Sequence, residues 1–393
     1  MTVNVTKPAV NVREKLAELD KPTGVAGEAM LRAETPQEQF NLIGAGRRNL
    51  LINGDMQIAQ RGTSATITAT GSSYDALDRF ESYRNSSYAP NFTISRDTTG
   101  PAGFSRSLKI DVDATATPSS GQNFGIRTKI EGYDAVQIGQ GTSGSKECTL
   151  SFYVKSNKTG TYGVQMFRFG GTYYSTTKGY TIDASDTWER KEITFTAFTT
   201  DSTPEEGNGV GTMIHFELST GSGDAIAPFD WTALGAARTV TGQVNLMDNT
   251  SNYWQITGVQ LEVGKVATPF EHRSYGEELA LCQRYYQRLG NNDGSNTHLM
   301  VGSAEATNVY VVSRSLLTPM RAVPTISLGN AVRAYTATAG VQTVNSFSTR
   351  CSRDIACISA NVTGSSTAGN AAVLYGADSI NSTGKYIVLD AEL

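Results

Sequence analysis

Short runs in which apolar and polar residues alternate dominate the middle of the chain, and they constrain its fold more than any other feature. Leu108, Ile110 and Val112 stand at every second position, the spacing that places side chains on one face of a β-strand. The alternation recurs in further runs at residues 149–155, 162–167, 192–198, 213–218 and 253–262. Turns rich in Gly, Ser, Thr and Asn separate these runs. We therefore predict a mainly β protein with an antiparallel β-sandwich, of the jelly-roll kind, over residues 47–276.

The composition agrees with a strand-rich chain and disfavours several other classes. Of the 393 residues, 39 are glycine and only 18% are charged, which argues against a helical bundle, a coiled coil or a disordered acidic chain. The formal net charge is −4, so no overall positive field attracts nucleic acid. No stretch approaches the roughly 18–20 consecutive apolar residues of a membrane span. We expect neither nucleic acid nor membrane insertion.

The first 46 residues carry helical spacing instead. Val12, Leu16 and Leu19 recur at intervals of four and three residues, which places them on one helical face. A second short helix is indicated by a capping-box pattern at residues 35–38. Its apolar residues are Phe40, Leu42 and Ile43. Helices this short need a partner, which can be the chain itself, a sister chain or another protein.

The end of the chain returns to strands after a short helix. Glu277 and Glu278 lie early and Arg284 and Arg288 late in residues 277–290, the charge order that suits a helix dipole. Short strand-like runs then follow to the end of the chain. We expect four parts: a helical segment at 1–46, the sandwich at 47–276, a helical connector at 277–290 and a smaller distal β domain at 291–393.

Cysteine and histidine usage gives no sign of a disulfide framework or a zinc site. The four cysteines are irregularly spaced: Cys148, Cys282, Cys351 and Cys357. Whether the last two are bonded stays open. The three histidines lack metal-ligand spacing. We expect no cofactor, with a calcium ion at Asp111 and Asp113 as the open alternative, because calcium takes carboxylate oxygens.

No motif for catalysis is evident. The chain has no GxSxG elbow. Glycan cleavage would need two carboxylates held roughly 5–9.5 Å apart. Five acidic residues lie in or near turns: Glu131, Asp134, Glu205, Glu206 and Asp224. The sequence brings no two of them together, so we expect a protein that is not an enzyme.

Aromatic residues at turns are the best candidates for glycan contact, because flat rings stack on the C–H faces of sugars. Tyr173 and Tyr174 follow a Gly-Gly turn, and Trp231 is the next candidate. Trp188 and Trp254 sit in strand-like runs, so we expect both in the core.

Five short motifs occur in order between residues 47 and 290. They are NLLINGDMQIAQRG at 49–62, DRF at 78–80, ITGVQLEVG at 256–264, TPFE at 268–271 and CQRYY at 282–286. Together they resemble the β-sandwich domain of tailed-bacteriophage tail fibre and related virion fibre proteins. The first and last segments of the chain match that family only by length and position.

The resemblance implies a jelly-roll sandwich similar to carbohydrate-binding modules, in a trimeric fibre of a phage particle made in the host cytoplasm. It implies that the N-terminal segment, with Arg47 and Arg48 at its joint, attaches to other tail or virion proteins. The β domains would then contact a host surface glycan or protein. A head fibre or decoration protein, or a carbohydrate-active depolymerase, are the alternatives.

Overall fold

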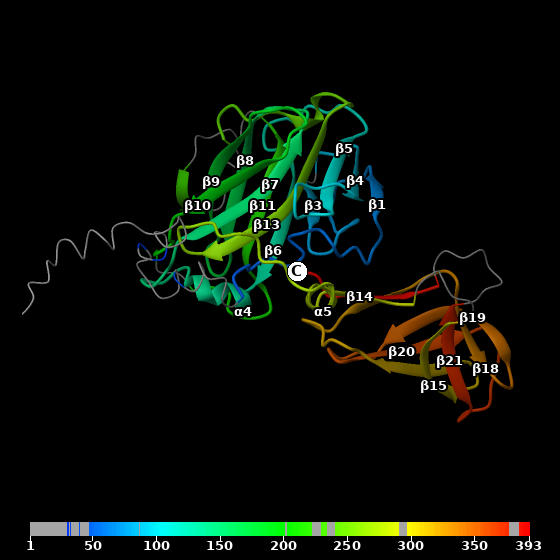
Figure 1. The fold of residues 1–393 in the computed structure, drawn as a ribbon. Helices are drawn as coiled ribbons and strands as arrows, with labels where there is room; N and C mark the ends of the chain where they lie inside the picture. The colour runs from blue at the N-terminus through cyan, green and yellow to red at the C-terminus, as the bar shows by residue number, and fades with distance from the viewer. Residues whose placement is uncertain are drawn as a thin grey trace, which may run out of the picture.

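The computed structural model describes residues 47–85, 87–200, 203–221, 229–233, 240–290, 297–376 and 385–393, together with three single residues near the N-terminus. A large β-sandwich and a smaller β unit lie beside each other (Figure 1). The described chain is mainly β and its sheets are antiparallel, as predicted.

Two sheets form the sandwich. Sheet A contains, in spatial order, β1 (Ser64–Ile67), β4 (Phe92–Asp97), β5 (Ser107–Val112), β13 (Tyr253–Val263), β7 (Cys148–Ser156) and β10 (Glu189–Phe195). Sheet B contains β12 (Phe229–Ala233), β9 (Tyr174–Ile182), β8 (Gly160–Arg168), β11 (Val210–Thr220), β6 (Asn123–Glu131), β3 (Glu81–Arg84) and β2 (Gly71–Ser73). Neighbours in each sheet are mostly far apart in sequence, so long-range pairing defines the fold.

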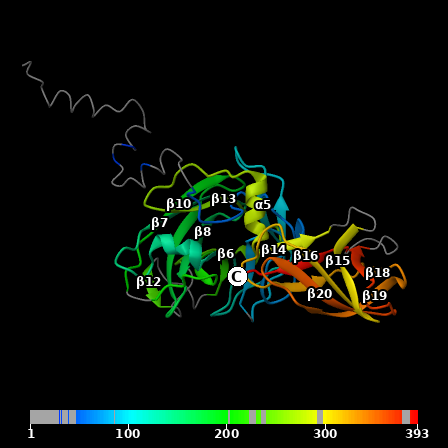
Figure 2. The same cartoon turned by 90° about the horizontal axis from the view of Figure 1, so that it is seen from below.

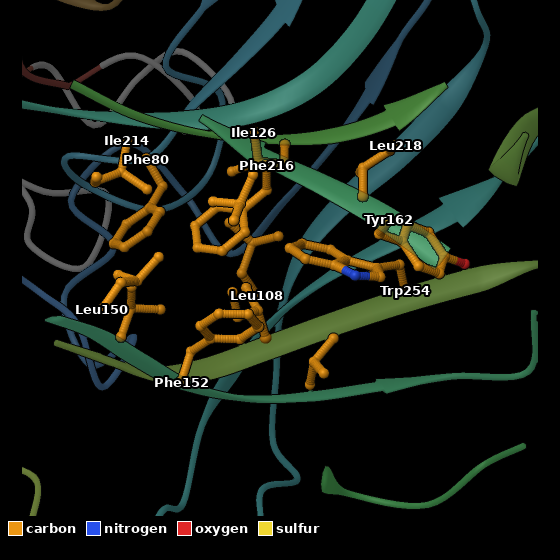
Figure 3. Packing of buried hydrophobic residues seen from close by; sticks show 14 of the residues in the cluster. Phe80, Leu108, Ile126, Leu150, Phe152, Tyr162, Ile214, Phe216, Leu218 and Trp254 are labelled. Atoms are coloured by element: carbon orange, nitrogen blue, oxygen red, sulfur yellow. The ribbon is translucent and has the colours of Figure 1, made fainter. Parts of the chain in front are cut away.

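The core lies between the two sheets, where side chains of alternating positions meet (Figure 3). Phe152 from sheet A and Phe216 from sheet B meet with ring centroids 5.1 Å apart. Trp254 is fully buried and lies 5.9 Å from Phe216, as expected. Trp188 is only half-buried, so its predicted core position is wrong. It immediately precedes the edge strand β10, where Lys155 covers its ring.

The second unit is built from a barrel and a small sheet. The barrel closes in the order β15 (Thr297–Ala306), β16 (Val309–Ser315), β20 (Ile355–Val362), β19 (Gly340–Thr349), β18 (Val332–Thr336) and β21 (Ala371–Gly376). The sheet contains β14 (Tyr286–Leu289), β22 (Ile387–Asp390) and β17 (Thr325–Leu328). A separate apolar core fills this unit.

The connector is only partly helical. Helix α5 spans Tyr275–Gln283, with Ser274 as its N-cap. The expected continuation of the helix to residue 290 is wrong, because Tyr286–Leu289 pairs with β22 as a strand. In the segments described from residue 47 onward, the other helical turns are α4 (Gly132–Ala135), η1 (Val136–Ile138) and η3 (Leu246–Asp248). Among the described residues, no helix is long and apolar enough to cross a membrane.

The motif residues tie the start of the sandwich to its close. The Asn49 side chain accepts a hydrogen bond from Leu261 N (3.1 Å) and donates one to Val259 O (3.1 Å). Arg273 donates to Asn49 O (2.6 Å) and pairs with Glu278 (3.3 Å). These buried groups satisfy one another, which gives the motif a structural role.

The residues after β22 lie between the sandwich and the barrel unit (Figures 1 and 2). Arg79 from the sandwich forms an ion pair with Glu392. Arg61 lies 3.2 Å from the same carboxylate, and Arg321 donates to Glu392 O at 2.7 Å. The two units therefore share a charged, largely buried junction.

Candidate functional site

The three aromatic residues singled out in the sequence lie near one end of sheet B but do not form one platform. Tyr173 is 47% exposed, and its ring centroid lies 5.1 Å from that of Phe169. Tyr174 and Trp231 pack on Phe198 at 4.7 Å and 5.1 Å. The structure thus joins Tyr174 to Trp231 and leaves Tyr173 on a separate, open ring pair with Phe169.

Trp231 serves the packing of this region. It is half-buried against the core, and its Nε1 donates to Thr196 O at 2.8 Å. Tyr174 is likewise half-buried at the start of β9. Of the three predicted contacts, Tyr173 is the one that presents an exposed ring.

A cavity of about 250 Å³ lies beside this ring pair, between the end of β8 and the α4–η1 turn. Phe169 lines it, and the exposed Tyr173 ring contacts Phe169 from outside the lining. Its polar lining comes from five residues: Gln140, Thr142, Arg168, Glu205 and Glu206. An aromatic edge and a polar lining therefore share one hollow.

Two buried side chains of this lining are held in place. Arg168 is 1% exposed, and its Nη1 donates to the carbonyl oxygens of Gly170 and Thr172. Gln140 is 6% exposed, and its Oε1 accepts from Thr212 Oγ1 at 2.8 Å. Burial lowers the pKa of the Arg168 guanidinium, which still leaves it positive at neutral pH. The site is therefore organised before any ligand arrives.

The cavity offers both hydrogen-bond donors and acceptors. Arg168 supplies N–H donors, Gln140 carries both kinds of group, and Glu205 and Glu206 supply acceptors. Glu205 Oε1 accepts from Gly207 N at 2.9 Å. Mixed donors and acceptors beside an aromatic ring suit a polyhydroxylated molecule.

Arg168 was not predicted from sequence, although a signal for it exists. Tyr162, Val164 and Met166 are the core-facing residues of β8. Arg168 continues the same every-second-residue series, so a charged residue occupies an inward position at the strand end. Gln140 follows η1 and carried no comparable signal, because its place depends on contacts with β11.

The carboxylates considered for catalysis separate into different roles. Glu131 is buried and forms a paired hydrogen bond with Arg284 at 2.9 Å and 2.8 Å. Asp134 lies 3.9 Å from Arg47. Among the described carboxylates of this set, Glu205 and Glu206 line the cavity. Asp224 lies outside the described residues.

The predicted attachment residues fall mostly outside the described residues: Val12, Leu16, Leu19, Phe40, Leu42 and Ile43. Arg48 donates from its backbone N to Glu271 and from Nη1 to Thr268 Oγ1 (2.5 Å). Arg47 is half-exposed at the surface, where it lies near Asp134. Arg48 is thus engaged by its own sandwich, whereas Arg47 keeps an accessible side chain.

The carboxylates considered for calcium have partners within the chain. Asp111 pairs with Lys109 at 2.8 Å, and Asp113 accepts from Thr93 Oγ1 at 2.9 Å. Over the part of the chain that the structure describes, no three His, Cys, Asp or Glu residues gather as a metal site. The four cysteines, all within described segments, are free thiols.

A polar row crosses the outer face of sheet B and was also missed by sequence reasoning. Thr177, Gln165, His215, Arg127 and Glu81 stand directly opposite one another on five neighbouring strands. Gln165 is 0% and His215 is 2% exposed. The centre of this face is closed, so it offers a ligand no open surface.

Comparisons with known proteins give no family assignment. No family model matches the chain, and no curated protein matches it. Among solved structures, a proposed sugar-binding protein from Bacteroides thetaiotaomicron is 13% identical, with a TM-score of 0.33 over 55% of this chain and 100% of that one. A xylan-binding domain from Paenibacillus barcinonensis is 9% identical, with a TM-score of 0.24 over 57% of this chain and 100% of that one.

The enzymatically active domain of tailspike protein 4 from bacteriophage CBA120 is 14% identical, with a TM-score of 0.26. That match covers 55% of this chain and 21% of the tailspike chain. The sandwich follows from its own strand order and pairing.

Proposed function

We propose that this chain binds a surface carbohydrate in the cavity beside Tyr173. The observation that carries the proposal is the contact of the exposed Tyr173 ring with Phe169, a half-buried ring that lines the cavity together with Arg168 and Gln140. Ligand sites commonly combine aromatic surface with a few fixed polar groups. A sugar ring stacked at the edge would place its hydroxyls toward the buried guanidinium and amide.

The size of the cavity points to one sugar unit. Its volume of about 250 Å³ is just below the roughly 300–1,000 Å³ of drug-sized sites. A single unit held by one ring pair gives weak binding, on the order of millimolar, and several linked copies raise the effective affinity. The proposed site therefore fits a protein that presents several copies at once.

We further propose that these copies belong to a virion fibre, a trimer attached through residues 1–46 to the tail of a phage particle. The motif series at residues 49–62 and 256–286 supports this assignment by resemblance. A head fibre or decoration protein is the alternative location. Light scattering on the full chain is expected to give a mass near three chains, and a monomer at micromolar concentration would count against the trimer.

Attachment has its own test. We expect deletion of residues 1–46 to abolish incorporation into particles and to leave the sandwich folded, as judged by its thermal transition. Normal incorporation of the shortened chain would refute this role.

A glycan array of bacterial surface polysaccharides tests the binding site. The wild-type chain is expected to bind at least one glycan, and Tyr173→Ala is expected to lose at least about tenfold of the signal. Tyr335→Ala is the matched control, because Tyr335 is a 44% exposed tyrosine on the barrel. Equal loss in both variants, or no loss in Tyr173→Ala, would refute the site.

Glycan cleavage is the second function to test, because Glu205 and Glu206 line the same cavity. A depolymerase would release reducing ends and lower the viscosity of the bound polysaccharide. We expect binding without either change. If wild type releases reducing ends and Glu206→Gln does not, the chain is an enzyme and the proposal that it only binds the glycan is wrong.

A further inference from the structure

A second hollow lies on the outer face of sheet A. It has a volume of about 560 Å³, within the roughly 300–1,000 Å³ typical of small-molecule sites. We call it the sheet A groove, defined by its lining residues Phe104, Tyr153, Arg190, Phe270 and His272. None of these residues contributes to the Tyr173 cavity.

Four aromatic rings line the groove. Phe104 is their centre, with ring centroids 5.4 Å from Tyr153, 5.1 Å from Phe270 and 5.2 Å from His272. The rings of Phe104, Tyr153 and Phe270 are half-buried, and the imidazole of His272 is exposed. A half-buried ring packs against the protein with part of its surface and leaves the rest accessible to solvent.

A β-bulge creates the space for this cluster. The pairing of β13 with β7 shifts register between Thr257 and Gln260, and Gly258 between them has a φ of 62°. A Cβ at Gly258 would lie 2.8 Å from the Phe104 ring, so the ring rests directly on the glycine. Bulges commonly re-aim side chains next to functional sites.

The charge of the arginine in the groove is balanced by a neighbouring carboxylate. Arg190 donates from Nη2 to Thr268 O at 3.2 Å and forms an ion pair with Glu192. The guanidinium is thereby fixed in position, and a carboxylate already balances its charge. Ser151 lines the groove on the same face of β7 as Tyr153. The groove thus offers hydrogen bonds without a net charge to attract an anion.

We propose that the sheet A groove is a second carbohydrate site, which takes a neutral hexose unit and works independently of the Tyr173 cavity. The Phe104 cluster stacks on the C–H face of the sugar, and Arg190 and Ser151 bond its hydroxyls. An acidic sugar gains nothing there, because Glu192 already occupies the arginine.

The test uses the full chain carrying Tyr173→Ala, which silences the first site, in titrations with lactose, maltose, cellobiose and sialyllactose. We expect at least one neutral disaccharide to bind, and Phe270→Ala in this background to weaken it by about tenfold or more. His272→Ala, at an exposed position, is expected to weaken it less and serves if Phe270→Ala alters the thermal transition. Tyr335→Ala is the control that should leave binding unchanged.

Three results would overturn the second site: no binding of any neutral disaccharide, full affinity after both ring substitutions, or stronger binding of sialyllactose than of the neutral sugars. The outcome is separate from that of the proposed function. If Tyr173→Ala binds every glycan as well as wild type while Phe270→Ala does not, the Tyr173 cavity fails and the groove stands.

Discussion

The Arg79 guanidinium forms an ion pair with Glu392, 313 positions further along the chain, and its centre lies 3.4 Å from the centroid of the Tyr285 ring. It also donates to Lys129 O at 2.7 Å. Two residues of the recognised motifs, Arg79 and Tyr285, are therefore occupied in joining the sandwich to the end of the described chain. Their role is structural, and it leaves ligand contact to other residues.

Replacing Arg79 is expected to destabilise the protein strongly. Arg79 is 1% exposed, and Arg79→Met leaves Glu392 with less compensation in a buried setting. Removing one partner of a buried pair costs about 3–5 kcal/mol. Chemical denaturation, followed for both units, measures this loss in the free energy of unfolding.

The control is an exposed pair of the same kind. Arg350 and Glu305 lie 3.2 Å apart with side chains 53% and 51% exposed, and surface pairs contribute about 0–1 kcal/mol. Arg350→Met should therefore change stability by less than about 1 kcal/mol. Equal effects of the two substitutions would show that the buried junction is not what stabilises the molecule.

Asp78 is expected to make stability depend on pH. Burial raises the pKa of the Asp78 carboxyl to about 6, although the charge of Arg61 opposes the rise. Because the pKa of Asp78 is higher in the folded than in the unfolded protein, the protonated carboxyl stabilises the folded state. This stabilisation is fully present below the unfolded-state pKa near 4 and is lost as pH rises through about 6. Asp78→Asn removes this dependence. As pH falls from 7 to 4, the free energy of unfolding of wild type should rise by up to about 3 kcal/mol relative to that of the variant.

Denaturation of both proteins at several pH values checks this prediction. The amide introduced by Asp78→Asn cannot titrate, and every other ionisable group is common to the two chains. The difference in stability between them therefore reports the titration of Asp78. A stability difference that stays constant from pH 4 to pH 7 would contradict the raised pKa.

Gly54→Ala is expected to destabilise the sandwich by about 3 kcal/mol, the upper range for overpacking. A Cβ at Gly54 would overlap the carbonyl oxygen of Val259, and the Gly54 carbonyl also accepts from Val259 N at 2.9 Å. Gly276→Ala is the matched control in α5, where a Cβ meets nothing within 4 Å. Thermal unfolding should show a large drop for the first variant and a small rise for the second.

The strands that the sequence predicted best are those with one strictly buried face. The run at residues 107–112 became β5 because Leu108, Ile110 and Val112 all face the core. The error at residues 286–289 has the opposite cause. That segment has helix-compatible local sequence, but its pairing with β22 about one hundred residues away decides its structure.

The candidate site could be derived from the sequence only in part for the same reason. The Gly-Gly turn placed Tyr173 at an exposed position, which needs local information alone. The cavity beside it joins β8, the turn after η1 and the segment before β11. Contacts among three distant segments carry no local pattern, so Gln140 and Glu205 could not be assigned to one site from sequence.

The carbohydrate site is tested most directly by a calorimetric titration with the best glycan from the array, comparing wild type, Tyr173→Ala and Tyr335→Ala in the full chain. We expect Tyr173→Ala to raise Kd by about tenfold or more and Tyr335→Ala to leave it unchanged. Both variants should keep the wild-type thermal transition. Unchanged affinity in Tyr173→Ala would contradict a carbohydrate site in the cavity beside that ring.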